Sequence, residues 1–302
     1  MIFFLFFQIF MVLPYLHGGE LITYARGNEV IDIDRLAPTD VMFYQTSSAF
    51  TYSAAQIKDR VNRTILLADI FGARLDKISD LFKTSVREPA VRNTSFANLV
   101  STKYMGIPES ADIAKRQVAT ELLHKDSALG GVYFTLANGD VYLGEPYADQ
   151  AQLPRLNYAD RDWYKGVSST NETYISSVFM SASTRAPKAA IALPVYDNDR
   201  KTTLLGYWLG LINIKMICKD IKDVYLPEGQ ELIVTDHHGT ELYNSGKYNY
   251  SKILTFPVIS QNDSKIIGTI ANATLRELDG NVVAISYPVV VNSHVWNITT
   301  IK

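Results

Sequence analysis

An arginine and two aromatic residues lie close together in the segment RDWYKGV, as Arg161, Trp163 and Tyr164. A guanidinium group donates two parallel hydrogen bonds to a carboxylate, and aromatic rings supply flat apolar walls that also attract ammonium groups. We therefore predict that these three residues bind a small organic ligand. Two structural alternatives stay open, because Arg161 could pair with Asp162 or Glu145 and Trp163 could be a core residue.

The sequence carries none of the short motifs that mark common enzyme classes. It lacks G-x-S-x-G, a P-loop, the Rossmann glycine triplet and H-E-x-x-H. His237 and His238 are adjacent and would face opposite sides of a strand, so we expect them at an exposed hairpin turn instead. The other three histidines show no metal-ligand spacing. We predict no enzymatic activity, no catalytic residue, no metal site and no cofactor.

The composition is that of an ordinary globular protein. Of 302 residues, 47% are hydrophobic and 20% are charged, which suits one large domain or two smaller modules. The net charge is −2 and no block of like charge stands out, so we expect no binding to nucleic acid. The only cysteine, Cys218, lies in the apolar segment MICKDI and is predicted to be a buried thiol.

The N-terminal segment predicts export. Residues 2–16 are apolar apart from Gln8 and Pro14, which is short for a membrane span but suits the core of a signal peptide. We expect residues 1–18 to be a signal peptide or a signal-anchor that attaches the chain to the membrane; a buried segment is the alternative. N-x-S/T sequons, which can accept glycans on exported surfaces, are numerous. They begin at Asn62, Asn93, Asn171, Asn249, Asn262, Asn272 and Asn297.

A long helix is predicted after a linker or irregular segment at residues 19–50. Apolar residues recur at spacings of three and four, and Pro89 bounds the pattern. Some 30 helical residues would span about 45 Å, more than one small module needs. The helix could be a spine, a homodimer contact, or a stripe packed on its own domain. The stripe comprises Ile57, Val61, Ile65, Ala68, Phe71, Leu75, Ile78 and Phe82.

Two units of helix followed by antiparallel strands make up the rest of the chain. A helix over 109–125 precedes strands joined by an Asn138-Gly139 turn, a strong hairpin signal. A short helix in ADRDWYKGV would have Asp160 as its N-cap, and three strands follow it over 173–214. A second helix over 215–226 precedes a hairpin at the histidine pair and two closing strands. This order predicts an α+β fold without a parallel sheet.

An ordered series of motifs over residues 50–302 resembles the double Cache (dCache) extracellular sensor domains of chemoreceptors and sensor kinases. The series begins with RDWYKGV and continues through a strand, the T-x-x-P turn at Thr184–Pro187 and a strand ending at Pro194. Looser matches follow in IVTDHHGTELYNS and AISYPVVVNSHVWNITTI. The resemblance implies a long N-terminal helix beside two PAS-like antiparallel-sheet modules in tandem.

The resemblance also implies a division of the chain. Residues 51–128 would hold the long helix and a second helix. Residues 129–215 would form the membrane-distal, ligand-binding PAS-like module, and residues 216–302 the membrane-proximal one. The ligand would be held by the distal module, at the residues of RDWYKGV and the strands around them.

One group of the family senses amino acids, and its motif matches Arg161, Trp163 and Tyr164. The tyrosine that this group has five residues before the arginine is Leu156 here, with Tyr158 nearby, and the tyrosine of the next strand aligns with Phe179. The acidic residue that would hold the amino group is missing from the GLINI strand. A buried ammonium without a counter-charge is costly, so a small organic acid fits at least as well as an amino acid.

Further candidates for the same cavity follow from strand alternation. On this basis we place Tyr133 and Tyr196 in the ligand site together with Tyr158 and Phe179, and Tyr174 and Tyr207 could lie beside them.

The resemblance implies a function in signal transduction or chemotaxis. The chain would be the extracytoplasmic small-molecule sensing domain of a receptor, located at the cell surface or in the periplasm, with a small carboxylate or an amino-acid-like molecule as its ligand. It ends at Lys302, directly after the last strand, so it would be a fragment of a longer receptor or would signal through a partner. The alternative is an exported solute-binding or surface interaction protein without its own signalling output.

Overall fold

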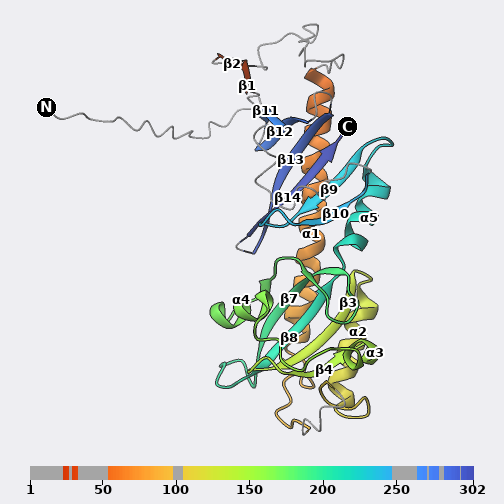
Figure 1. Ribbon diagram of the computed structural model, residues 1–302. Coiled ribbons are helices and arrows are strands. Elements are labelled where there is room, and N and C mark those ends of the chain that lie inside the picture. Colours follow the sequence, from red (N-terminus) through yellow and green to blue (C-terminus); the bar gives the residue numbers. More distant parts are fainter. Residues whose placement is uncertain are drawn as a thin grey trace, which may run out of the picture.

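Two antiparallel sheets are stacked end to end along one long helix (Figure 1). The computed structural model describes residues 23–26, 29–32, 54–97, 105–246, 264–270, 272–278, 282–292 and 294–302. The α+β fold with a long N-terminal helix and two antiparallel sheets, predicted from the sequence, is confirmed. The predicted signal segment at residues 1–18 lies outside the described residues. Within the described part of the chain, no helix combines the length and apolar character that crossing a membrane requires.

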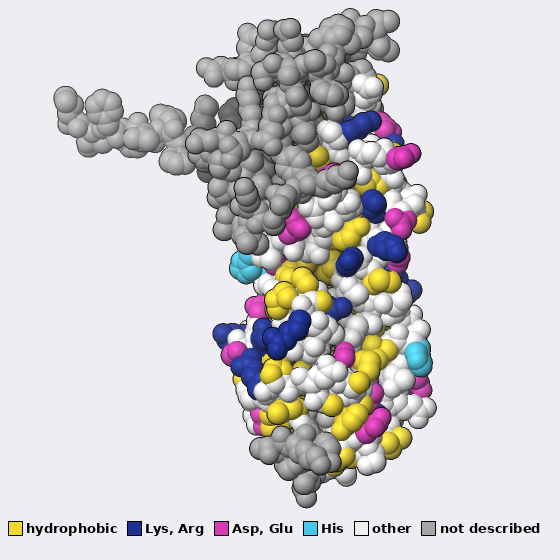
Figure 2. Space-filling view, turned by 45° about the vertical axis from the view of Figure 1, so that its right-hand side comes forward, with side chains coloured by type: hydrophobic (Ala, Val, Ile, Leu, Met, Phe, Trp, Pro, Cys, Tyr) yellow, Lys and Arg dark blue, Asp and Glu magenta, His cyan; other side chains and the backbone are white. Residues whose placement is uncertain are grey.

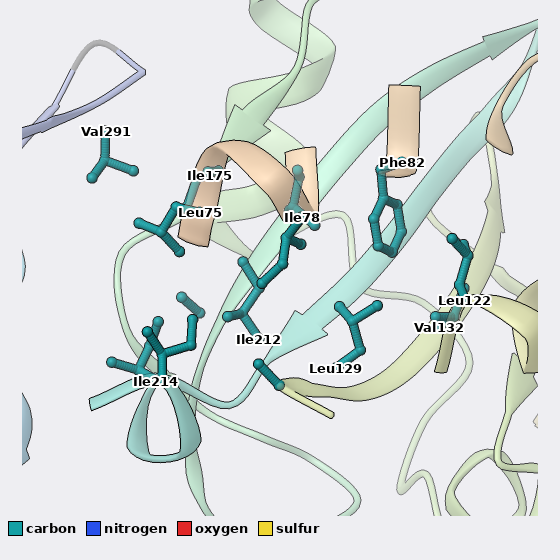
Figure 3. Packing of buried hydrophobic residues seen from close by; sticks show 14 of the residues in the cluster. Leu75, Ile78, Phe82, Leu122, Leu129, Val132, Ile175, Ile212, Ile214 and Val291 are labelled. Carbon is teal, nitrogen blue, oxygen red and sulfur yellow. The ribbon is translucent and has the colours of Figure 1, made fainter. Parts of the chain in front are cut away.

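Helix α1 (Ala54–Ser85) is the spine of the molecule and packs against both sheets of its own chain. Its stripe from Ile57 to Phe82 is buried as predicted, except that Leu67 is buried in place of the half-buried Ile65. Figure 3 shows Leu75, Ile78 and Phe82 of this helix among residues from both sheets. Of the three roles left open for the helix, the structure therefore shows the spine and the packing on its own domain.

Polar contacts fix α1 to both ends of the fold. The Arg74 guanidinium donates two hydrogen bonds of 3.0 Å to the carboxylate of Asp126, which is only 1% exposed. Further toward its N-terminus, the Thr64 hydroxyl lies 2.7 Å from that of Thr300 in the last strand. A buried carboxylate is stable only when its charge is compensated, so these contacts define one position of the helix relative to the sheets.

The first sheet and its helices form the first module. The sheet has the strand order β4-β3-β8-β7-β5, with β6 pairing to β7, and the predicted Asn138-Gly139 hairpin joins β3 to β4. Its strands are β3 (Leu129–Leu136), β4 (Val141–Glu145), β5 (Tyr174–Ile175), β6 (Phe179–Met180), β7 (Pro187–Tyr196) and β8 (Leu204–Ile212). Its helices are α2 (Ile113–Lys125), α3 (Tyr147–Ala151) and α4 (Asp162–Thr170).

Three local predictions for this module are corrected. Helix α2 begins at Ile113 and not near residue 109, because Asp112 is its N-cap and accepts a hydrogen bond from the Lys115 backbone. Helix α4 begins at Asp162 with no side-chain cap, since the Asp160 carboxylate pairs with Arg155 at 2.5 Å instead of capping the helix. The single strand expected over 173–183 is divided into β5 and β6.

The second sheet and helix α5 (Ile214–Tyr225) form the second module. The strand order is β10-β9-β14-β13-β12-β11-β1-β2. Cys218 of α5 is fully buried and burial raises the pKa of its thiol, in agreement with the predicted structural role. The strands are β1 (Thr23–Arg26), β2 (Glu29–Asp32), β9 (Glu231–Thr235), β10 (Glu241–Asn244), β11 (Ser264–Ile270), β12 (Ala273–Leu278), β13 (Val282–Val291) and β14 (His294–Ile301).

Strands β1 and β2 differ from the irregular linker predicted for residues 19–50. Strand β1 pairs with β11, about 240 positions later in the chain. Such a strand is stabilised by backbone hydrogen bonds to a strand far away in the sequence. Its own short sequence therefore shows no alternation of apolar and polar residues from which a strand could be predicted.

Candidate ligand site on the first module

A small hollow of about 40 Å³ lies on one face of the first sheet, beneath helix α4 and strand β6. Arg161, immediately before α4, and Phe179 of β6 line it together with Tyr133 of β3 and Leu211 of β8. A hollow of this size holds about three water molecules, whereas sites for drug-sized ligands measure about 300 to 1,000 Å³. A ligand here is therefore either very small or requires α4 and β6 to move away from the sheet.

Five of the seven residues predicted for the ligand site line this hollow, and two do not. The five are Tyr133, Tyr158, Arg161, Trp163 and Phe179. Tyr164 lies outside the lining, where its hydroxyl donates a 2.7 Å hydrogen bond to the Ala137 carbonyl. Tyr196 also lies elsewhere, at a separate open groove where the Lys201 ammonium is 5.6 Å from its ring centre.

The Arg161 guanidinium has no carboxylate partner within the described part of the chain. It lies over the Phe179 ring, 5.6 Å from the ring centre. Glu145 pairs instead with Arg116 at 2.6 Å, and Asp162 accepts hydrogen bonds from the backbone and side chain of Ser177. Both structural partners considered for Arg161 are thus engaged elsewhere, which leaves a half-buried cation at the edge of the hollow.

Three buried hydroxyl groups line the same hollow without a hydrogen bond of standard geometry to any described residue. They belong to Tyr133, Thr135 and Tyr158. A buried polar group without a partner costs about 1–3 kcal/mol, so a ligand or ordered water that accepted hydrogen bonds from these hydroxyls would stabilise the site. Burial raises the pKa of both tyrosines, and both therefore stay neutral donors at physiological pH.

Among the described residues, the remainder of the lining is apolar or weakly polar and includes no carboxylate. Trp163 is only 3% exposed and belongs to the core cluster under α4, so it is both a core residue and a wall of the hollow. Thr135 and the residues that complete the lining were not predicted from the sequence, because short apolar and hydroxyl side chains on strands and turns give no local signal. These residues are Val141, Leu153, Ser181, Ala182, Ser183, Leu209 and Leu211.

Local backbone contacts hold Arg161 and Tyr158 in place. The chain before α4 runs along the β3–β4 turn, where the Tyr158 amide donates to the Gly139 carbonyl at 2.9 Å. The Arg161 amide in turn donates to the Tyr158 carbonyl at 3.1 Å. Because Gly139 has a φ of 89° and a Cβ there would meet Ala159, glycine is required at this turn.

The hollow combines a free cation, three hydroxyl donors and short apolar walls. The carboxylate group of a ligand can accept two hydrogen bonds from Arg161. The other end of the same ligand, or a hydroxyl substituent on it, can then reach the tyrosine hydroxyls. An ammonium group would find aromatic faces but no opposite charge in the lining. The chemistry of the site therefore favours a small carboxylate over a free amine.

Solved structures share this architecture at low sequence identity. The ligand-binding domain of the Pseudomonas aeruginosa PAO1 amino acid chemoreceptor PctC, in complex with GABA, matches with a TM-score of 0.56 and 16% identity over 81% of this chain and 98% of that chain. That of the chemoreceptor PctB, in complex with L-Arg, matches with a TM-score of 0.55 and 17% identity over 80% and 87%. The chain has the double Cache fold.

Two further comparisons concern longer proteins. An extracellular ligand binding receptor from Desulfohalobium retbaense matches with a TM-score of 0.52 and 14% identity; the match covers 78% of this chain but 39% of that one. Sporulation kinase D of Bacillus subtilis is 27% identical over 150 residues, 49% of this chain. The chain thus spans about a quarter of the length of that kinase. No family model matches the sequence.

Proposed function

We propose that this chain is the extracytoplasmic ligand-sensing domain of a signalling receptor, and that the hollow beneath α4 binds a small carboxylate. The observation that carries the proposal is the Arg161 guanidinium, which has no carboxylate partner among the described residues, beside three buried hydroxyls without a hydrogen bond of standard geometry to those residues. The solved structures with this fold support a sensing role, since they include ligand-binding domains of chemoreceptors in complex with amino acids or GABA. The kinase relative supports a role in signalling.

The proposed mechanism uses the position of the hollow between α4 and the first sheet. A carboxylate that binds Arg161 on one side and the Tyr133 hydroxyl on the other draws α4 and β3 together. The change then passes to α1, which packs on both modules and can transmit a small displacement along its length.

In the receptor, the first module would be distal and the second proximal to the membrane. The N-terminal apolar segment would be an export signal or anchor, α1 a homodimer contact, and the domain would not be an enzyme.

A thermal-shift screen of the purified chain tests the proposal. Small monocarboxylates, amino acids and amines are each added to the wild type and to the Arg161→Gln variant. At 100 times its dissociation constant a ligand adds about 2.7 kcal/mol, which corresponds to a rise in Tm of about 5 °C or more. We expect carboxylates to raise the Tm of the wild type alone. Shifts with amines only, or equal shifts in the variant, would contradict the proposed chemistry.

A further inference from the structure

The stacked rings of His237 and His294 lie at the boundary between the two modules, with the ring of His238 tilted by 43° beside that of His237. The rings of His237 and His294 are parallel within 6°, with centres 3.9 Å apart. The centre of the His238 ring lies 4.0 Å from that of His237. His237 and His238 belong to the β9–β10 turn, whereas His294 begins β14. Among the described residues, no group of three or more histidine, cysteine, aspartate or glutamate side chains is arranged to hold a metal ion.

The stack lies against the segment of the first module that contains β5 and β6. The His294 Nε2 atom is 3.1 Å from the Tyr174 hydroxyl, and the His237 Nε2 atom is 3.5 Å from the Ser177 hydroxyl. Beside them, the Val178 amide donates a 3.1 Å hydrogen bond to the carboxylate of Asp236. These are contacts between modules, so the position of the first module relative to the second depends on them.

One carboxylate joins this boundary to the ligand site. Asp162, the first residue of α4, accepts hydrogen bonds from the Ser177 amide at 2.8 Å and from its hydroxyl at 3.0 Å, and the Tyr174 hydroxyl donates to it at 3.3 Å. The Tyr174 ring also lies against Gly166 of α4, where any Cβ would collide with it. Asp162 stands between Arg161 and Trp163 in the chain, so a change at the boundary reaches the hollow directly.

We propose that His237, His238 and His294 form a proton-sensitive joint that holds α4 against the second module at neutral pH and releases it in mildly acidic conditions. When two stacked rings are protonated, their like charges repel one another across about 4 Å. The β9–β10 turn and the start of β14 then separate, and the contacts from Tyr174, Ser177 and Val178 weaken.

The electrostatic environment of His237 gives the direction of the effect. Burial lowers its pKa, and the neighbouring His294 and His238 lower it further, while Asp236 and Asp162 act in the opposite direction. Its Nδ1 atom is buried without a hydrogen-bond partner among the described residues. The assembled joint therefore binds fewer protons than the open one. It is fully stable above the ordinary histidine pKa of about 6.5 and weakens as the pH falls below it.

Hydrogen exchange of the full chain, measured between pH 7.5 and 5.5 and corrected for the intrinsic rate, tests the joint without any ligand. It therefore does not depend on the proposed function. We expect the protection of residues 174–180 to fall at pH 5.5 by up to about tenfold, the limit for one histidine that binds a proton with the ordinary pKa of about 6.5 only in the open joint. In the His237→Gln variant the protection should not change with pH. His124→Gln, which alters an exposed histidine on α2, should behave as the wild type.

A titration of the wild type by NMR keeps the proposal testable if His237→Gln does not fold. The ring protons of His237 should titrate with a midpoint below about 6.5, the ordinary histidine value. Constant protection of residues 174–180 across the pH range, an unchanged pH dependence in His237→Gln, or an ordinary titration of His237 would each overturn the joint.

Discussion

Replacing Phe82 by alanine lowers the free energy of unfolding by about 3–5 kcal/mol, the cost of removing a large aromatic side chain from a packed core. Phe82 is fully buried on α1, and its ring lies over Gly210 of β8, where a Cβ would collide with it. The Trp208 indole donates to the Ser85 hydroxyl one turn further along the helix at 3.0 Å. The substitution thus leaves a cavity where the spine helix meets the first sheet. Urea denaturation monitored by circular dichroism measures the change.

Leu66→Ala is the matched control on the same helix. Leu66 is 47% exposed, so its truncation should change stability by less than about 1 kcal/mol. Equal effects of the two substitutions would contradict the position assigned to the helix, because a helix that did not pack on the first sheet would have no buried face at Phe82.

Arg116→Ala should destabilise the first module by about 3–5 kcal/mol, because it leaves a largely buried carboxylate without its counter-charge. Arg116 is 4% exposed and pairs with Glu145 at 2.6 Å. It also donates to the carbonyls of Ile107 and Gly144 and to the side chain of Gln150, each at 3.1 Å. Gly144 and Glu145 end β4, where Gly144 pairs with Tyr133 of β3, so the variant should also lose protection in β4. Thermal and urea unfolding provide the measurement.

Arg155→Ala provides the comparison for Arg116, since it also removes an arginine from an ion pair. The pair between Arg155 and Asp160 is exposed at both side chains, 44% and 59%, and such pairs contribute about 1 kcal/mol or less. If Arg155→Ala proved as costly as Arg116→Ala, the assignment of Arg116 as a buried support of the hollow would be wrong.

The elements that carry a local signal could be predicted from the sequence. The stripe of α1 repeats over about thirty residues, and Asn138-Gly139 marks its hairpin without help from the rest of the chain. The pairing of β1 with β11 could not be predicted, because it joins residues far apart in sequence. The division of one expected strand into β5 and β6 likewise depends on Asp162 and Asp236, which bind the backbone between them.

The candidate ligand site shows the same limit of prediction for single side chains. Arg161 and Trp163 could be placed because they are neighbours in one motif, but Tyr164 follows Trp163 on a helix and points about 100° away from it. Tyr196 was expected in the hollow from strand alternation. A β-bulge between Val195 and Tyr196 interrupts that alternation, and a shift of one residue moves a side chain to the other face.

The fold also brings together groups that no sequence spacing relates. His294 lies 57 positions after His237, and the two rings meet only because the β9–β10 turn and the start of β14 lie at the same end of the second sheet. On the face seen in Figure 2, acidic and basic side chains are interspersed, apart from one local group of Lys and Arg side chains.

Isothermal titration of the strongest carboxylate from the screen into the full chain tests the central claim most directly. The wild type should bind one molecule per chain, and Arg161→Gln should weaken binding about 30-fold, since a charge-assisted bidentate contact contributes about 2 kcal/mol. Arg200→Gln, at an exposed position on the β7–β8 loop, should leave the affinity unchanged. Affinity in Arg161→Gln within twofold of the wild type, or no saturable heat in the wild type, would contradict a carboxylate site at this hollow.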